Sequence, residues 1–162
     1  GYIYQPIKHE DLLSKIAITG RAGFTLDDNG RLITVMDKPV DCPVGIFNNQ
    51  NAMSTSVVYD FKPAPSGIVC NFKNEANSNI DEGLRVMMDG EDYKNPKRDI
   101  EQASLDLVTN INQVYSLMRY GLATRIYGKN ALTWKCGVEG FDIQFGNVIK
   151  VSNIPFSLQL TN

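Results

Sequence analysis

Apolar side chains recur with two different periods in the opening part of the chain. Residues 9–22 carry them at helical spacing, at Leu12, Leu13, Ile16 and Ala17, and Gly20 and Gly23 mark the end of the segment. This pattern predicts an amphipathic helix. Two strand-like runs, 24–26 and 31–36, flank the sequence Asp27-Asp28-Asn29-Gly30. Asn-Gly between such runs is the strongest short-range signal for a β-hairpin, so we expect a helix followed by a hairpin.

A second helix is predicted over residues 110–128. Its apolar stripe consists of Val114, Leu117, Met118, Leu122 and Ile126. Asn110 is the expected N-cap, with Gln113 as its capping-box partner, and Gly128 is expected to end the helix. Gly121 interrupts the stripe at a cost of about 1 kcal/mol relative to alanine. That cost predicts that another element approaches the helix closely at this position.

Strand-like runs occupy much of the remaining chain. They cover residues 54–61, 68–72, 84–88, 100–108, 131–137 and 148–151, whereas the polar segments 75–83 and 91–99 are expected to form surface loops. Two helices among about eight short strands favour an α+β fold. We expect small antiparallel or mixed β-sheets with two main helices.

The length of 162 residues allows one domain or two small ones. The expected division places a helix, the hairpin and a connector in residues 1–52, and a β-rich subdomain with helix 110–128 in residues 53–162. One continuous domain over residues 1–162 is the alternative. The chain opens at Gly1 without an initiator methionine and closes on a strand-like run over residues 154–160. We therefore expect a segment of a larger protein.

The net charge and the number of cysteines argue against a nucleic-acid-binding protein and against a disulfide-linked protein. The formal net charge is −2, which argues against a nucleic-acid partner because such proteins carry a basic surface. The longest apolar runs, such as residues 16–18, are far too short to span a bilayer. The three cysteines, Cys42, Cys70 and Cys136, cannot form a complete disulfide framework because their number is odd. We expect buried free thiols in a protein that folds in a reducing cytosol.

The sequence offers no recognisable catalytic or metal-binding arrangement. The single histidine, His9, is expected at an exposed helix start without a partner nucleophile. Three scattered cysteines and one histidine do not make a zinc site. The turn Asp27–Gly30 begins like a calcium loop, but its glycine comes too early and strand residues follow at once. The acidic turn 89–92 is expected to be a surface loop, and we assign no catalytic, cofactor-binding or metal-binding residue.

Several elements, in order, resemble one phage protein family. After the first helix and the hairpin come Asp37-Lys38-Pro39, a Phe-x-x-x-Asn-hydrophobic element over residues 47–52, and the strands 54–59 and 68–74. The most specific match is a helix of the type Q-V-x-x-L-x-R-x-x-L over residues 113–122, a strand over residues 132–137, and the closing element 145–151. These features resemble the central region of the tail-tip attachment (host-specificity J) protein of lambda-like phages and prophages. Phe145 and Asn147 depart from the proline and aspartate usual in that family.

The resemblance implies a baseplate-hub-like fold at the tail tip of a virion, within a protein made in the bacterial host cytoplasm. It also implies a homotrimer that contacts other tail proteins and uses no cofactor. Because the receptor-binding part of such proteins lies further toward the C-terminus, this segment would be a scaffold for host attachment. A scaffold predicts an extensive flat or apolar surface left by missing neighbours.

Two other functions stay open on the sequence. A carbohydrate- or cell-surface-binding module predicts an aromatic-lined groove, for which seven tyrosines are available: Tyr2, Tyr4, Tyr59, Tyr93, Tyr115, Tyr120 and Tyr127. A peptidoglycan hydrolase of the tail tip predicts two facing carboxylates, one of them with a raised pKa.

Overall fold

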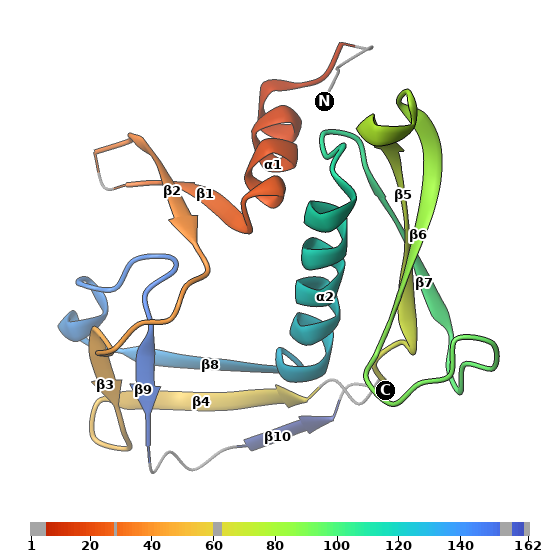
Figure 1. Cartoon of the computed structure of the whole chain (residues 1–162). Helices are drawn as coiled ribbons and strands as arrows, with labels where there is room; N and C mark the ends of the chain where they lie inside the picture. The colour runs from red at the N-terminus through yellow and green to blue at the C-terminus, as the bar shows by residue number, and fades with distance from the viewer. Residues whose placement is uncertain (1–5, 28, 60–62, 153–156, 161–162) are drawn as a thin grey trace. The chain divides into compact units, whose positions relative to one another are not determined.

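The computed structural model describes residues 6–27, 29–59, 63–152 and 157–160. These residues form two helices and several small sheets (Figure 1), which confirms the predicted α+β class. The chain divides into two compact units, each assembled from separate stretches of sequence. Unit 1 contains residues 1–19 and 62–129, and unit 2 contains residues 20–61 and 130–162. The division into domains 1–52 and 53–162 that the sequence suggests stays a prediction.

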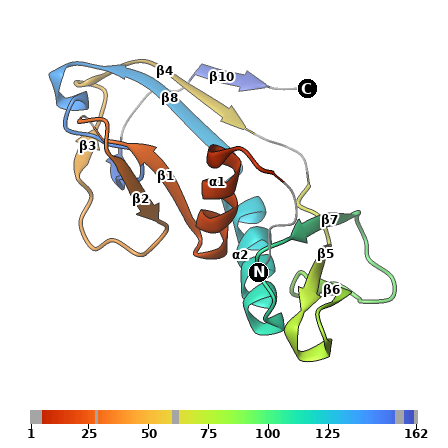
Figure 2. The same cartoon turned by 90° about the horizontal axis from the view of Figure 1, so that it is seen from above.

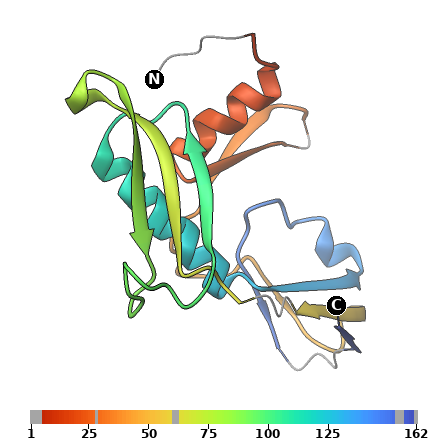
Figure 3. The ribbon, with the colours of Figure 1, turned by 90° about the vertical axis from the view of Figure 1, so that its right-hand side faces the viewer.

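Unit 1 combines a three-stranded mixed sheet with two helices. Its elements are α1 (His9–Thr19), β5 (Gly67–Asn74), β6 (Ile80–Met87), β7 (Ile100–Leu105) and α2 (Ile111–Tyr127). The central strand β5 pairs antiparallel with β6 and parallel with β7. Helix α2 covers one face of this sheet (Figure 3). The core between them contains Ile68, Cys70, Phe72, Val86, Val108, Val114, Leu117, Met118 and Leu122.

Helix α2 begins where the sequence predicts. The side-chain Oδ1 of Asn110 accepts hydrogen bonds from the backbone N–H groups of Asn112 and Gln113 at 3.0 and 3.4 Å, so the N-cap prediction is confirmed. The prediction that the Gln113 side chain completes the capping box, by binding the backbone N–H of Asn110, is wrong. The Gln113 side-chain amide instead donates to the Thr19 carbonyl at the end of α1, at 3.1 Å.

The predicted loop over residues 75–83 is also wrong in its second half. A short 3₁₀ helix, Glu75–Asn77, follows β5, and Ser78 and Asn79 then adopt positive φ angles of 53° and 57°. These two residues reverse the chain, so β6 already begins at Ile80. The polar residues that suggested a loop serve this tight turn: the side-chain amides of Asn74 and Asn77 donate to the Glu82 carboxylate at 2.8 and 2.6 Å.

Unit 2 consists of three small sheets (Figure 2). Strands β1 (Ala22–Leu26) and β2 (Leu32–Met36) form the predicted antiparallel hairpin. Strand β3 (Gly45–Phe47) pairs parallel with β9 (Ile149–Val151). Strand β4 (Ala52–Tyr59) lies between β8 (Asn130–Cys136), which is antiparallel to it, and β10 (Ser157–Leu160), which is parallel.

The hairpin turn of unit 2 is stabilised by one aspartate. The Asp27 carboxylate accepts hydrogen bonds from the backbone N–H groups of Asn29 and Arg31 at 3.0 and 2.7 Å, and Gly30 adopts a φ of 72°. These hydrogen bonds confirm that the acidic segment is a hairpin turn, as the sequence predicts. Asp28 lies outside the described residues.

Candidate functional site

Two kinds of ionisable side chain bear on acid–base chemistry, namely the single histidine and the carboxyl groups whose pKa is shifted. His9 is exposed at the first residue of α1, as expected. The pKa values of Glu82, Asp89, Glu91 and Asp106 are lowered, mainly because hydrogen-bond donors stabilise their ionised forms. A carboxylic acid that donates a proton at neutral pH requires a raised pKa instead. Among residues 6–27, 29–59 and 63–152, no three His, Cys, Asp or Glu side chains cluster as a metal site.

The three cysteines occupy three different environments. Cys70 is fully buried in the core of unit 1, and burial raises the pKa of its thiol. Cys136 is partly buried, whereas Cys42 is exposed, and all three are free thiols. The prediction of buried thiols is therefore right for Cys70 and wrong for Cys42, because Cys42 lies in the exposed connector between β2 and β3.

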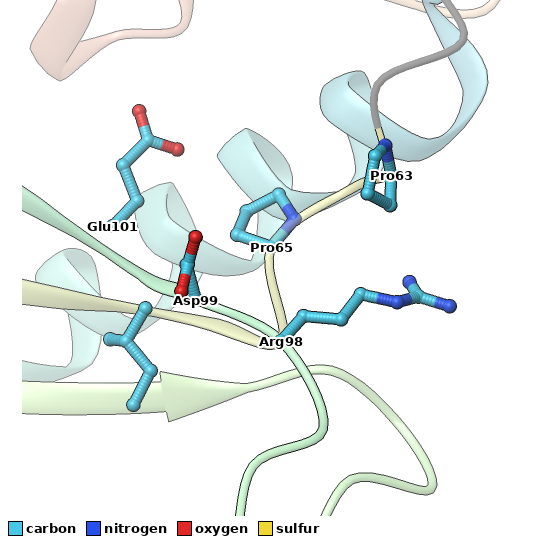
Figure 4. Close-up of a pocket in the computed structure, with 6 residues that line it drawn as sticks. Pro63, Pro65, Arg98, Asp99 and Glu101 are labelled. Atoms are coloured by element: carbon cyan, nitrogen blue, oxygen red, sulfur yellow. The ribbon is translucent and has the colours of Figure 1, made fainter.

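A shallow groove of about 460 Å³ lies at the start of β7 in unit 1 (Figure 4). It is lined by Pro63, Pro65, Arg98, Asp99, Ile100 and Glu101. The Glu101 carboxylate is bound by the Arg125 guanidinium of α2 at 2.6 Å, and Arg98 donates to the Ala64 carbonyl at 3.2 Å. The described lining contains no aromatic ring of the kind on which sugar-binding sites commonly stack their ligand.

The acidic turn after β6 is firmly attached to the sheet and to α2. The Asp89 carboxylate forms a bidentate pair with the Arg119 guanidinium, with N–O distances of 2.7 and 3.0 Å. The Glu91 carboxylate accepts hydrogen bonds from the hydroxyl of Ser66 and the backbone N–H of Lys97, both at 3.1 Å. The surface position expected for this turn is correct, but its carboxylates hold the loop in place.

Ser66 is the centre of this attachment, and no pattern in the sequence indicates this role. It is fully buried, its N–H donates to the Asp99 carbonyl, and its carbonyl accepts from the Met88 N–H. Its hydroxyl also accepts from the Arg98 N–H at 2.8 Å. A serine in a Pro-rich turn is ordinarily read as solvated, so only the tertiary structure shows this role.

Helix α1 leaves much of its apolar surface uncovered. None of its residues is buried, and Ile16 and Ile18 are each 52% exposed. Polar contacts join it to the rest of unit 1, including an ion pair between Lys15 and Asp106 at 2.5 Å. Burial of an apolar face normally supplies most of a short helix's stability, and in α1 this face is only partly covered.

Unit 2 exposes apolar side chains as well. Val138, Phe141 and Phe145 are 76%, 85% and 67% exposed on one segment that follows β8. These three side chains are close in sequence, and most of the surface of each is in contact with water. No helix within the described residues has the length and apolar character needed to cross a membrane.

The Phe-x-x-x-Asn element identified in the sequence has a structural explanation in unit 2. Phe47 is 1% exposed and packs on Trp134, with ring centroids 5.1 Å apart. The Asn51 side chain accepts from the Asn48 N–H at 2.8 Å and donates to the Ile46 carbonyl at 3.0 Å. The phenylalanine anchors the core and the asparagine closes the turn between β3 and β4.

The closing element of the resemblance is a tight turn. Gly146 has a φ of 89°, and a Cβ at this position would lie 2.0 Å from Cγ1 of Val35. The Asn147 side chain accepts a hydrogen bond from the Gln144 N–H at 2.8 Å. An asparagine oxygen thus provides the acceptor that an aspartate would provide, and Phe145 remains at the exposed side of the turn.

Two solved structures of tail proteins share this fold. No protein-family model and no curated protein matches the sequence. The tail protein from Neisseria meningitidis MC58 aligns over 89% of this chain and 44% of its own length, with a TM-score of 0.61 and 14% identity. The 43 kDa tail protein of prophage MuSo2 from Shewanella oneidensis aligns over 96% of this chain and 44% of its own length, with a TM-score of 0.51 and 15% identity. The chain thus spans less than half of either protein, and its fold is that of a part of these two tail proteins.

Proposed function

We propose that this chain is a structural component of a phage or prophage tail. The observation that carries the proposal is the shared fold, which extends over 89% and 96% of the chain in two proteins described as tail proteins. Fold alone does not determine function. The ordered sequence features that resemble the tail-tip attachment family give independent support, because they are features of the sequence and not of the backbone.

The finer assignment is a scaffold at the tail tip or baseplate hub that supports host attachment. In this role the full-length protein forms a homotrimer, contacts other tail proteins and resides in the virion tail after synthesis in the host cytoplasm. The exposed apolar side chains of α1 and of segment 138–148 support such contacts, since neighbouring proteins would remove them from water. The free, buried thiol of Cys70 is consistent with folding in a reducing compartment.

A structural role also agrees with the electrostatics of unit 1. The carboxylates with lowered pKa values accept hydrogen bonds from side chains or backbone N–H groups, and two of them, Asp89 and Asp106, are bound by residues of α2 and α1. These interactions hold the loops in one conformation and keep the four carboxyl groups ionised. Both properties suit a rigid structural protein.

Immunogold electron microscopy of tails from the strain that encodes the chain tests the location. We expect label at the tip of the tail, and tails from a strain with the gene deleted should be incomplete or unable to attach to cells. Label along the tube would exclude the hub assignment but keep the tail role. Complete, infectious tails without the protein would refute both.

Matched substitutions test whether segment 138–148 is an assembly surface. Phe141→Ser removes the most exposed aromatic ring of this segment, whereas Glu139→Ser removes a neighbouring polar side chain. We expect the first variant to be depleted from purified tails and the second to be incorporated normally. Equal incorporation of both would show that this surface is not an assembly contact.

The two alternative functions have direct assays. Clearing of a suspension of purified cell walls by the full chain would contradict the non-enzymatic role. Specific binding on a glycan array would favour a carbohydrate-binding module over a scaffold.

A further inference from the structure

Strand β6 forms one edge of the three-stranded sheet in unit 1. It pairs with β5 over its full length, from Ile80 opposite Asn74 to Met87 opposite Gly67, without a register shift. Its other side pairs with no strand in the described part of the chain, and Figure 3 shows it at the margin of the sheet. Natural edge strands are commonly shortened, bulged, broken by proline or covered. β6 is eight residues long and has neither proline nor bulge.

The side chains of β6 are arranged so that the strand complements itself. Asp81, Gly83 and Arg85 alternate with the core-facing Leu84 and Val86, so they share the outer face of the sheet. In an antiparallel pair, residues directly opposite one another point to the same face. If a second β6 runs antiparallel about Gly83, Asp81 of each copy lies opposite Arg85 of the other. Moving the symmetry centre by one residue, to Leu84, removes both opposite-charge pairs.

The two charged side chains of this edge, Arg85 and Asp81, can reach a second copy of the strand. The Arg85 guanidinium lies 4.7 Å from the centroid of the Tyr93 ring, and its Nε donates to Met87 Sδ at 3.3 Å. Within the described residues, no hydrogen bond from the terminal nitrogens of Arg85 is found, so they are available as donors. The Asp81 side chain is 79% exposed, and its ion pair with Lys73, at 3.4 Å, is open to solvent. Gly83 at the centre lets two backbones approach closely.

We propose that two copies of the free chain pair through β6, antiparallel about a twofold axis at Gly83, to form one continuous six-stranded sheet. Such an interface is isologous, because each copy contributes the same surface. A strand edge with charges of one sign would repel a second copy of itself. In β6, the proposed pairing forms two opposite-charge pairs, each between Asp81 of one copy and Arg85 of the other. The inference is independent of the proposed tail role, and its failure would leave that role untouched.

Sedimentation equilibrium of the full chain, with charge reversal, tests this pairing. We expect a reversible dimer in the unmodified chain. Asp81→Arg or Arg85→Asp alone should raise the dissociation constant about tenfold or more, because two attractive cross-strand pairs become repulsive. The double variant Asp81→Arg with Arg85→Asp should restore the dimer. Lys94→Asp, which changes the same charge in the exposed loop outside β6, serves as the control and should dimerise normally.

Amide hydrogen exchange gives a readout that needs no substitution. At concentrations above the dissociation constant, amides of residues 80–87 should become more protected, while the outer strand β7 should not change. A chain that stays monomeric, an oligomer whose stability ignores both single reversals, or concentration-dependent protection at β7 alone would overturn the proposal. Failure of the double variant to recover, while it remains folded by circular dichroism, would do the same.

Discussion

Replacing Gly121 by alanine should stabilise unit 1. Glycine costs about 1 kcal/mol relative to alanine in a helix interior, and Gly121 lies in the middle of α2. An added Cβ would lie 3.6 Å from Ile68 Cδ1 and 3.5 Å from Arg125 Nη1, which are ordinary contact distances. A buried methyl group contributes up to about 0.8 kcal/mol, and this site is half-buried. We therefore expect the free energy of unfolding to rise by about 1 to 1.5 kcal/mol.

Urea denaturation can measure this change separately in the two units. Far-ultraviolet circular dichroism follows the helices of unit 1, whereas the single tryptophan, Trp134, reports on unit 2. With an m-value of roughly 2 kcal/mol per molar urea, the midpoint of the helical transition should rise by about 0.6 M.

Gly121→Leu is the matched control, because leucine has nearly the helix propensity of alanine but its larger side chain would crowd Ile68. It should be less stable than the alanine variant. A loss of stability in Gly121→Ala would mean that β5 approaches α2 more closely than 3.6 Å allows. Equal stabilisation by both variants would mean that the position does not face the sheet.

Three further substitutions or conditions test other parts of the structure. Gly146→Ala should lower the stability of unit 2 by about 2 kcal/mol or more, measured by tryptophan fluorescence, because the new Cβ would lie 2.0 Å from Val35 Cγ1 at a φ of 89°. Asn110→Ala should cost unit 1 about 1 kcal/mol in urea denaturation, and Asn110→Ser should recover most of it. The hydrogen bonds from Arg119 lower the pKa of Asp89, so the unfolded state binds the proton more tightly than the folded state. This contribution to stability is present at neutral pH and is lost as the pH falls below about 4; thermal unfolding of Asp89→Asn across that range should show a weaker pH dependence.

Local signals in the sequence were sufficient where one short segment determines the conformation. The hairpin of β1 and β2 follows from Asn29-Gly30 between two apolar runs, and the N-cap of α2 follows from Asn110. The same reasoning failed where a residue's partner lies elsewhere in the chain. Gln113 fits a capping box by spacing, yet its amide binds the end of α1. Competition between a local and a distant partner is not visible in a local pattern.

Sheet topology lay beyond the sequence for a similar reason. The parallel pairs of β5 with β7, and of β3 with β9, join segments that are far apart in sequence and carry no turn signal. The hydrophobic pattern does not indicate the start of β6, because Asp81 and Glu82 are polar and suggest a loop. On an edge strand, however, one face and one side of the backbone remain in water, so charged residues are compatible with a strand.

Four of the residues that carry the family resemblance have a structural role in this chain. Phe47 fills the core of unit 2, Asn51 closes the turn after it, and Gly146 occupies a conformation and a space that only glycine fits. Arg119, in the helical part of the pattern, holds the turn at Asp89. These roles are core packing, turn closure, a glycine-only conformation and an ion pair, and none of the four involves a reacting group. Residues with such roles are kept wherever the fold is kept, so the resemblance that they carry speaks for a shared fold.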